Sequence, residues 1–153
     1  MSNTYSQIHI PCVFAVKYRS SLIKDKWKEQ LYKYISGIIQ NKGHKVLAIN
    51  GMADNVHIFF GMRPDQSLSD LMRYVKGESS EWVNLQKFTP SVFRWQEGYG
   101  AFSYSRSQIS SVCNYIANQE QHHAKKTFIE EYREILKAFD VEYNDQYIFT
   151  EPV

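Results

Sequence analysis

Hydrophobic and polar residues alternate along residues 8–16, a pattern typical of a strand with one buried face. Pro11 interrupts the run of backbone donors, so we expect this strand to have an open side or a bulge there. The apolar positions of the buried face are Ile8, Ile10, Cys12, Phe14 and Val16, with Gln7 and His9 on the other face.

A helix and a hairpin are predicted next. Apolar side chains recur at helical spacing over residues 25–41, and Gly43 follows as a left-handed terminator. Residues 46–50 and 55–62 are apolar enough for strands, and a short turn at 51–54 joins them. The three segments together predict a strand, a helix and then a strand hairpin.

A second long helix is predicted over residues 68–83. Ser67 stands at its N-cap position, and Asp70 follows three residues later, as in a capping box. Short strands are expected at 93–95 and 101–104, around a glycine-rich turn. Beyond them the pattern predicts helices over residues 107–121 and 126–140 and an extended piece at 146–149.

The order of these elements is strand, helix, strand, strand, helix, strand, followed by extra C-terminal helices. This is the βαββαβ order of the ferredoxin-like α+β class. We therefore expect an antiparallel sheet with helices on one face, and an opposite face that is open for binding. No linker or repeat divides the chain, so residues 1–153 are expected to form a single domain.

Charge, cysteine count and the length of the apolar runs exclude several classes of protein. The 153 residues carry 18 Lys and Arg against 16 Asp and Glu, a formal net charge of +2, so any nucleic acid must bind in a local groove. The two cysteines form no CxxC pair, which excludes a zinc ribbon. Residues 1–7 are polar and no apolar run approaches membrane-spanning length, so we expect a soluble, cytoplasmic protein that does not enter a membrane.

Four residues could form a catalytic and metal site. Asn55 and His57 share one face of the strand predicted over 55–62, and Tyr115 and Gln119 share one side of a helix. A tyrosine hydroxyl can attack phosphorus when a metal or base assists it. Taken alone, these residues suit ordinary structural roles better: a satisfied strand histidine and an amphipathic helix edge.

The wider pattern resembles the single-tyrosine HUH transposases of the insertion sequence 200/605 family. The related REP-associated tyrosine transposases share much of it. The resemblance extends over about residues 5–149. It rests on residues 54–59 (DNVHIF), 79–82 (SSEW), 95–103 (WQEGYGAFS) and 115–123 (YIANQEQHH).

The resemblance implies a ferredoxin-like catalytic domain of a prokaryotic mobile element, usually a homodimer, that cleaves and rejoins single-stranded DNA beside a hairpin. It implies that Tyr115 is the nucleophile and forms a 5′-phosphotyrosine. It also implies a divalent cation, Mg²⁺ or Mn²⁺, with Gln119 as the helix ligand and His57 as the second histidine of the His-hydrophobic-His motif.

The sequence departs from that family at Asn55, which replaces the first histidine of the motif. An amide oxygen can bind a hard cation but is a weaker ligand than imidazole. Asp54 precedes it and, on a regular strand, points to the opposite face. His122 follows Gln119 by three residues, and a surface position suits it better than a ligand role.

Contacts to DNA are also expected. Basic side chains could hold phosphates, and aromatic rings beside the glycine turn could stack on unpaired bases or belong to the core. Taken singly, each basic residue suits a solvated surface better than a DNA contact. The candidates are Lys17, Arg19, Arg73, Lys76, Trp95 and Tyr99.

Two function classes follow from these residues. The first is a transposase that works through Tyr115 and a divalent metal. The second is a domesticated or catalytically decayed protein that binds single-stranded DNA hairpins without chemistry, which the substitution at Asn55 favours. An RNA-binding ferredoxin-like domain is less well supported, because the strands lack its usual aromatic signature.

Overall fold

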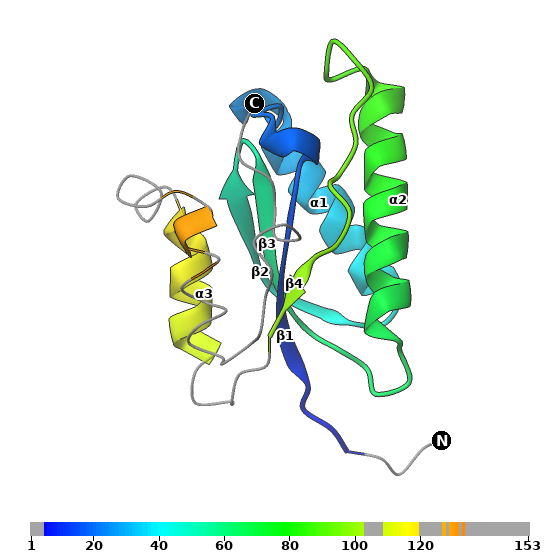
Figure 1. Cartoon of the computed structure of the whole chain (residues 1–153). Coiled ribbons are helices and arrows are strands. Elements are labelled where there is room, and N and C mark those ends of the chain that lie inside the picture. Colours follow the sequence, from blue (N-terminus) through cyan, green and yellow to red (C-terminus); the bar gives the residue numbers. More distant parts are fainter. Residues whose placement is uncertain (1–4, 103–108, 120–126, 128, 132, 134–153) are drawn as a thin grey trace.

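The computed structural model describes residues 5–102, 109–119, 127, 129–131 and 133. Their helices and strands follow the predicted order through the second long helix (Figure 1). The elements are β1 (His9–Ala15), the 3-10 helix η1 (Lys17–Arg19), α1 (Asp25–Asn41), β2 (Lys45–Met52), β3 (Asn55–Gly61), α2 (Leu68–Gln86), β4 (Gly100–Ala101) and α3 (Ile109–Ala117).

The strands form one antiparallel sheet in the order β2-β3-β1-β4. This is the strand order of the ferredoxin-like arrangement, and it confirms the predicted α+β class. The two central strands pair along their whole length, from His9 opposite Gly61 to Ala15 opposite Asn55. No helix among the described residues is long and apolar enough to cross a membrane.

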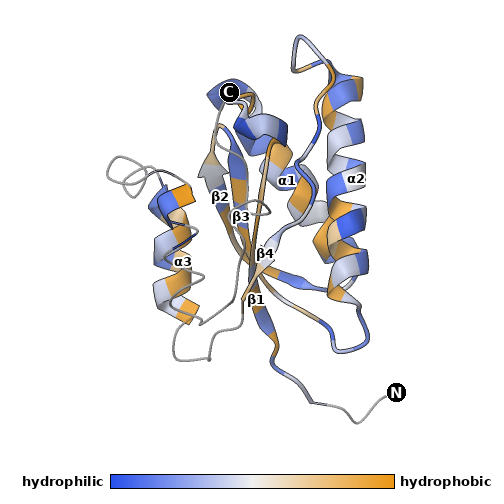
Figure 2. Ribbon diagram, viewed as in Figure 1, coloured by the Kyte–Doolittle hydropathy of each residue, from blue (hydrophilic) through white to orange (hydrophobic). Residues whose placement is uncertain are grey.

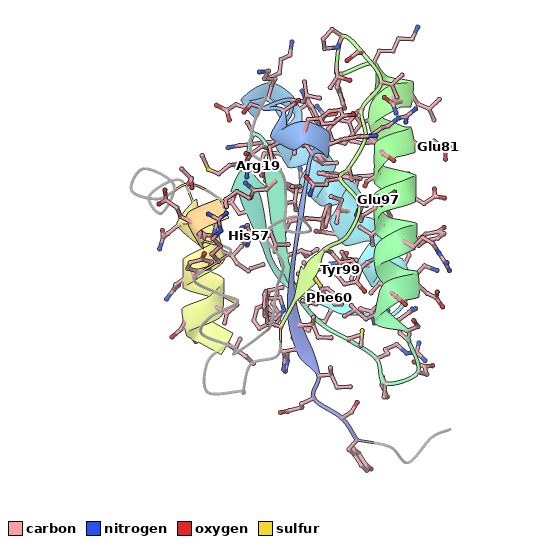
Figure 3. The ribbon with its side chains drawn as sticks, in the orientation of Figure 1. Arg19, His57, Phe60, Glu81, Glu97 and Tyr99 are labelled. Atoms are coloured by element: carbon pink, nitrogen blue, oxygen red, sulfur yellow. The ribbon has the colours of Figure 1, made fainter. Side chains whose placement is uncertain are left out.

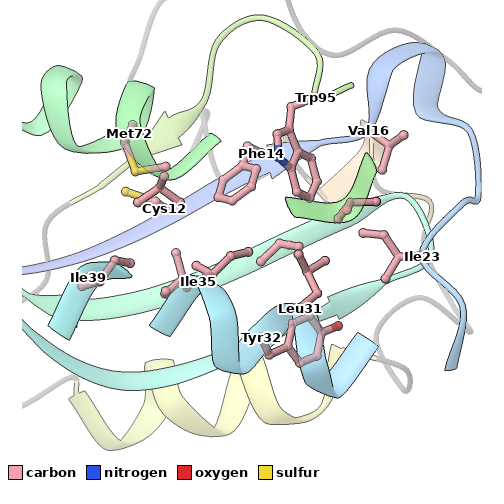
Figure 4. Close-up of a cluster of buried hydrophobic side chains, with 14 of the residues drawn as sticks. Cys12, Phe14, Val16, Ile23, Leu31, Tyr32, Ile35, Ile39, Met72 and Trp95 are labelled. Carbon is pink, nitrogen blue, oxygen red and sulfur yellow. The ribbon is translucent and has the colours of Figure 1, made fainter. Parts of the chain in front are cut away.

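The main core lies between the sheet and the pair α1 and α2 (Figures 1 and 4). The predicted buried face supplies Cys12 and Phe14 of β1 and Val16, which follows this strand, and β3 supplies Val56 and Ile58. Both helices carry hydrophobic residues among polar ones (Figure 2), and buried members such as Leu31 of α1 and Leu71 of α2 belong to this core. Burial raises the pKa of Cys12 to about 12, so this thiol stays protonated and inert, as expected of a buried free cysteine.

Local signals end and begin the helices where the sequence places them. Gly43 follows α1 with a φ of 88°, the left-handed conformation that glycine adopts without strain. Ser67 accepts a hydrogen bond from the backbone N–H of Asp70 and so caps α2. The carboxylate of Asp70 does not complete a capping box but accepts a hydrogen bond from Arg73.

Pro11 lies where its missing N–H is tolerated. In an antiparallel strand the N–H and C=O of one residue point to the same side. The backbone N–H of Phe102 donates to the carbonyl of Pro11 over 3.1 Å, so this side faces the short β4 segment and not β3. The expectation of an open side or a bulge at Pro11 is therefore wrong, because the chain after β4 lies along this side and the register with β3 is regular.

A β-bulge in β2 changes which side chains face each layer. The register with β3 shifts between Val46 and Ala48. Val46 and Ile49 consequently pack on the main core, while Leu47 and Ala48, although adjacent, both pack on the opposite layer. Asn50 then faces that same layer, where it bonds to α3.

The strands predicted at 93–95 and 101–104 are wrong in extent. Trp95 forms only an isolated bridge with Val16, and β4 has two residues; positions 103 and 104 lie outside the described residues. Asn84 of α2 accepts from the backbone N–H of Phe93 and donates to its carbonyl. Because a helix side chain satisfies this backbone, the segment needs no strand partner there.

The second sheet face is not fully open, contrary to expectation. α3 packs on it over β2 and β3, opposite α1 and α2 (Figure 1). Val112 and Ile116 form the apolar contact with Phe59 of β3, and all three are buried. The segment at 129–131 is helical, in agreement with the start of the helix predicted over 126–140, whose remainder lies largely outside the described residues.

A buried ion pair joins η1, the 3-10 helix after β1, to the turn between β2 and β3. The guanidinium of Arg19 donates to Asp54 through Nε at 2.8 Å and through Nη2 at 2.7 Å. Arg19 is only 3% exposed, and both it and Tyr18 have positive φ values, 56° and 61°. The pair thus compensates for a backbone conformation that costs free energy in non-glycine residues.

We expect Asp54→Ala to lower the free energy of unfolding by about 3 kcal/mol, because it leaves a buried guanidinium without its carboxylate. Asp65→Ala is the matched control, since its pair with Arg63 is exposed and contributes under about 1 kcal/mol. Urea unfolding followed by circular dichroism measures both variants. Equal losses in the two variants would show that the buried pair has no special role.

Candidate catalytic and metal-binding site

The alternation of β3 sends two polar side chains towards α3. Asn55 and His57 share the face of Phe59, which packs on α3, whereas Val56 and Ile58 lie in the main core. His57 is 6% exposed and lies beside α3 (Figure 3). The predicted strand register is therefore confirmed.

Tyr115 meets His57 across this layer. The two ring centroids lie 6.1 Å apart, with the rings at 74° to each other. Tyr115 is half-buried at the edge of the apolar stripe of α3, as the helical spacing predicts. The amide of Asn50 donates to the carbonyl of Ala117 over 3.2 Å, so β2 also holds the last turn of the helix that carries Tyr115.

Asp54 orients Asn55. Its Oδ1 accepts from the Asn55 amide nitrogen over 2.6 Å, while its Oδ2 binds Arg19. Asp54 lies in the turn before β3, so the expectation that it points away from Asn55, which assumed a regular strand, is wrong. With its amide nitrogen held by Asp54, Asn55 is left with its amide oxygen as the group available for a ligand.

Two buried amide oxygens have no hydrogen-bond donor within the described residues. They are Oδ1 of Asn55 and Oε1 of Gln119, and both residues are fully buried. The amide nitrogen of Gln119 donates to the Tyr115 carbonyl over 3.4 Å, so its oxygen is free for another group. Buried oxygens without donors cost free energy unless a donor or a cation meets them, and amide oxygens are ligands of hard cations.

Glu131 is a site residue that the sequence reasoning missed. It is 5% exposed, and its Oε1 lies 3.5 Å from Nε2 of His57. It belongs to the helical residues 129–131, and the hydroxyl of Thr127, which precedes them, accepts from the N–H of Glu130. The sequence contains two adjacent glutamates there, and only helix phase and docking decide that Glu131 is buried while Glu130 is exposed.

Three of the predicted DNA contacts have structural roles. Trp95 is 8% exposed, packs edge-on against Phe14 and donates to the Ser79 hydroxyl, so it belongs to the core and offers no free face to a base. Arg19 is the buried partner of Asp54 described above. Lys76 donates to two backbone carbonyls of the loop before β4, and burial lowers its pKa.

The other DNA candidates are more accessible. Arg73 is exposed on α2 and pairs with Asp70. Lys17 is half-buried and lies over the ring of Tyr18. Tyr99 is half-buried against the core, and burial raises its pKa. His122 lies outside the described residues, as does the part of the predicted 107–121 helix beyond residue 119.

Comparison with known proteins agrees with this arrangement. The family model for IS200-like transposases matches residues 4–119. A curated relative, the ISDra2 transposase TnpA of Deinococcus radiodurans, is 22% identical over 118 residues, which cover 74% of this chain and 84% of the relative.

Two solved structures share the fold. A transposase from Deinococcus radiodurans R1 superposes with a TM-score of 0.62 at 22% identity, over 78% of this chain and 95% of the other. A REP-associated tyrosine transposase bound to a REP hairpin gives a TM-score of 0.62 at 12% identity, over 100% of this chain and 96% of the other. Because the family model spans most of the residues, this chain belongs to the IS200-like transposase family.

Proposed function

We propose that this protein cleaves and rejoins single-stranded DNA, with Tyr115 as the nucleophile. The observation that carries the proposal is the packing of the Tyr115 ring against His57. Asn55 shares the strand face of His57, and Gln119 lies one helical turn after Tyr115, with its amide nitrogen on the Tyr115 carbonyl. A hydroxyl beside a group of polar ligands is the arrangement that phosphoryl transfer to a side chain requires.

In the proposed step the Tyr115 hydroxyl oxygen forms a bond to the scissile phosphorus, and the bond from phosphorus to the 3′ oxygen breaks. The phenol loses its proton and the departing 3′ oxygen gains one, so no proton is consumed overall. The products are a 5′-phosphotyrosine and a free 3′-hydroxyl. Attack of a 3′-hydroxyl on the phosphotyrosine reverses the step and joins two strands, which requires no other source of energy.

His57, Gln119 and Asn55 would hold a divalent cation, Mg²⁺ or Mn²⁺. When bound, the cation would neutralise charge on the scissile phosphate. The support for this is the donor set itself, which combines the His57 imidazole with two amide oxygens. Those two oxygens, Oδ1 of Asn55 and Oε1 of Gln119, accept no hydrogen bond from the described residues. The burial of all three residues limits the access of water to the site.

The proposed substrate is single-stranded DNA with a hairpin. A solved relative of the same fold is bound to a REP hairpin. Lys17 and Arg73 remain available to contact phosphates, since neither is buried. With a net charge of only +2, the chain would rely on such local contacts and not on a uniformly basic surface.

A second candidate is a hairpin-binding protein without chemistry. Asn55 favours it, because an amide is a weaker ligand than the histidine of the family motif. The two candidates differ in one observable, a covalent protein–DNA product. Hairpin binding in a gel-shift assay without such a product under Mg²⁺ or Mn²⁺ would favour the second candidate.

Tyr115→Phe should abolish the covalent adduct on a single-stranded hairpin oligonucleotide, because it removes only the attacking hydroxyl. The ring and its contact with His57 remain, so the free energy of unfolding should change by no more than about 1 kcal/mol. The adduct is measured on a denaturing gel after incubation with Mn²⁺. Tyr74→Phe, at an exposed tyrosine of α2, is the matched control and should still form the adduct. If Tyr115→Phe forms the adduct, another residue is the nucleophile.

Asn55→His should raise both Mn²⁺ affinity and cleavage rate, because it restores a pair of imidazole ligands on β3. Each tenfold gain in affinity corresponds to about 1.4 kcal/mol. Mn²⁺ accepts nitrogen ligands more readily than Mg²⁺, so the gain should be larger with Mn²⁺. Asn55→Ala should lower cleavage if the amide oxygen is a ligand. Calorimetry measures the affinity, and cleavage of a hairpin oligonucleotide measures the rate. If both are unchanged in Asn55→His, position 55 does not belong to the metal site.

We also propose that the protein is a homodimer, on the strength of its family resemblance. Size-exclusion chromatography with light scattering should give twice the chain mass of 18.0 kDa at micromolar concentration. A mass equal to that of one chain would contradict the proposal.

A further inference from the structure

We infer that Glu131 is a direct ligand of the divalent cation and supplies the strong donor that Asn55 does not. This inference rests on the proposed function, because it concerns the same cation site. It adds an anionic ligand from a helix that follows α3, outside the strand and helix motifs that define the candidate site.

The position of Glu131 carries the inference. Its Oε1 lies 3.5 Å from Nε2 of His57, and the side chains of both residues are 7% exposed. Adjacent ligands of an octahedral cation with bonds of about 2.1 Å lie about 3 Å apart. The separation is longer than a good charge-assisted hydrogen bond and close to the spacing of two ligands that share one ion.

Charge complementarity supports the same assignment. Asn55 and Gln119 contribute neutral amide oxygens, and a histidine binds metal as a neutral imidazole. Glu131 therefore adds the negative charge to this set of four donors. Hard divalent cations bind preferentially where carboxylate oxygens are present, so one carboxylate raises the affinity of an otherwise neutral site.

Helix capping fixes which glutamate enters the site. The backbone N–H of Glu130 donates to the Thr127 hydroxyl, and that of Glu131 donates to the Thr127 carbonyl, so the first turn is held at both residues. Ile129 is 1% exposed and anchors the same turn. In this phase Glu131 is buried beside His57, and Glu130 is exposed to solvent.

The assignment also predicts cation preference. Three of the four donors are oxygens, which suits Mg²⁺ and Mn²⁺ and disfavours softer ions. The set contains no thiolate, and among the described residues no three His, Cys, Asp or Glu side chains are placed so that they could hold a metal ion by themselves. The site is therefore built from mixed amide, imidazole and carboxylate groups.

The test is Mn²⁺ binding without DNA, measured by calorimetry and by electron paramagnetic resonance of free Mn²⁺. Glu131→Gln keeps the shape of the side chain and removes its charge. Even outer-shell groups contribute about 10–100-fold to metal affinity, so losing a direct ligand should weaken binding at least about tenfold. Glu130→Gln is the matched control and should bind Mn²⁺ as the unmodified protein does.

A second background separates a direct ligand from a residue that acts through His57. If Glu131 acts only by orienting the imidazole or pairing with it, Glu131→Gln should not change Mn²⁺ binding once His57 is replaced by alanine. We expect Glu131→Gln to weaken Mn²⁺ binding further in this background, which electron paramagnetic resonance follows at millimolar Mn²⁺. If Glu131→Gln does not weaken Mn²⁺ binding in the His57→Ala protein, Glu131 is a positioning residue and the inference is overturned.

The outcomes also distinguish this inference from the proposed function. If the unmodified protein binds Mn²⁺ and Glu131→Gln binds it equally well, the inference fails and the metal site of the proposed function stands. If the unmodified protein binds no Mn²⁺, both the inference and the proposed metal site fail. If Mn²⁺ binding depends on Glu131 but Tyr115 forms no adduct, the cation site stands and the proposed chemistry fails.

Discussion

The contact between Phe59 and α3 is the interaction on which the candidate site depends. Phe59, Val112 and Ile116 form a small apolar cluster on the sheet face opposite the main core. Each such buried side chain contributes about 1.5–3 kcal/mol. Ordering the helix costs conformational entropy of about 1–2 kcal/mol per residue. Because only a few side chains contribute, their burial does not offset this cost for the whole helix, so the apolar contact alone is insufficient. The hydrogen bond from Asn50 to the end of α3 adds a polar attachment.

The same docking explains why buried polar groups gather beside an apolar cluster. Once Phe59 is covered, the neighbouring positions of β3 on that face are covered as well, and these are Asn55 and His57. Polar groups withdrawn from water must be satisfied by protein or by a ligand. Asp54 satisfies the amide nitrogen of Asn55, and Arg19 in turn balances Asp54. A structural ion pair thus determines the orientation of a candidate ligand two side chains away.

The sequence predicts the features that local signals control. Alternation identifies β1 and β3 and their faces, Gly43 and Ser67 mark helix ends, and helical spacing puts Tyr115 at the edge of an apolar stripe. These signals act between residues near in sequence, so one chain suffices to identify them.

The predictions from sequence are wrong where contacts between residues far apart in the chain decide the structure. Asn84 satisfies the backbone of Phe93 and so replaces a strand partner, and α3 covers a sheet face that the element order leaves open. Trp95 and Lys76 have sequence contexts that suit nucleic-acid contacts, yet packing places one in the core and one under a loop. Glu131 could not be distinguished from Glu130 for the same reason, because burial depends on how its helix docks.

Gly51 gives the hairpin an unusual mutational sensitivity. A Cβ at this position of β2 would collide with the backbone carbonyl of Asn55 on the neighbouring strand. Backbone cannot move aside as a flexible side chain does, so any larger residue would force β2 and β3 apart. Asn50 precedes Gly51 and holds the end of α3. One added methyl group, at a residue that has no polar side chain, would therefore displace both the strand that carries His57 and the strand that holds the end of α3.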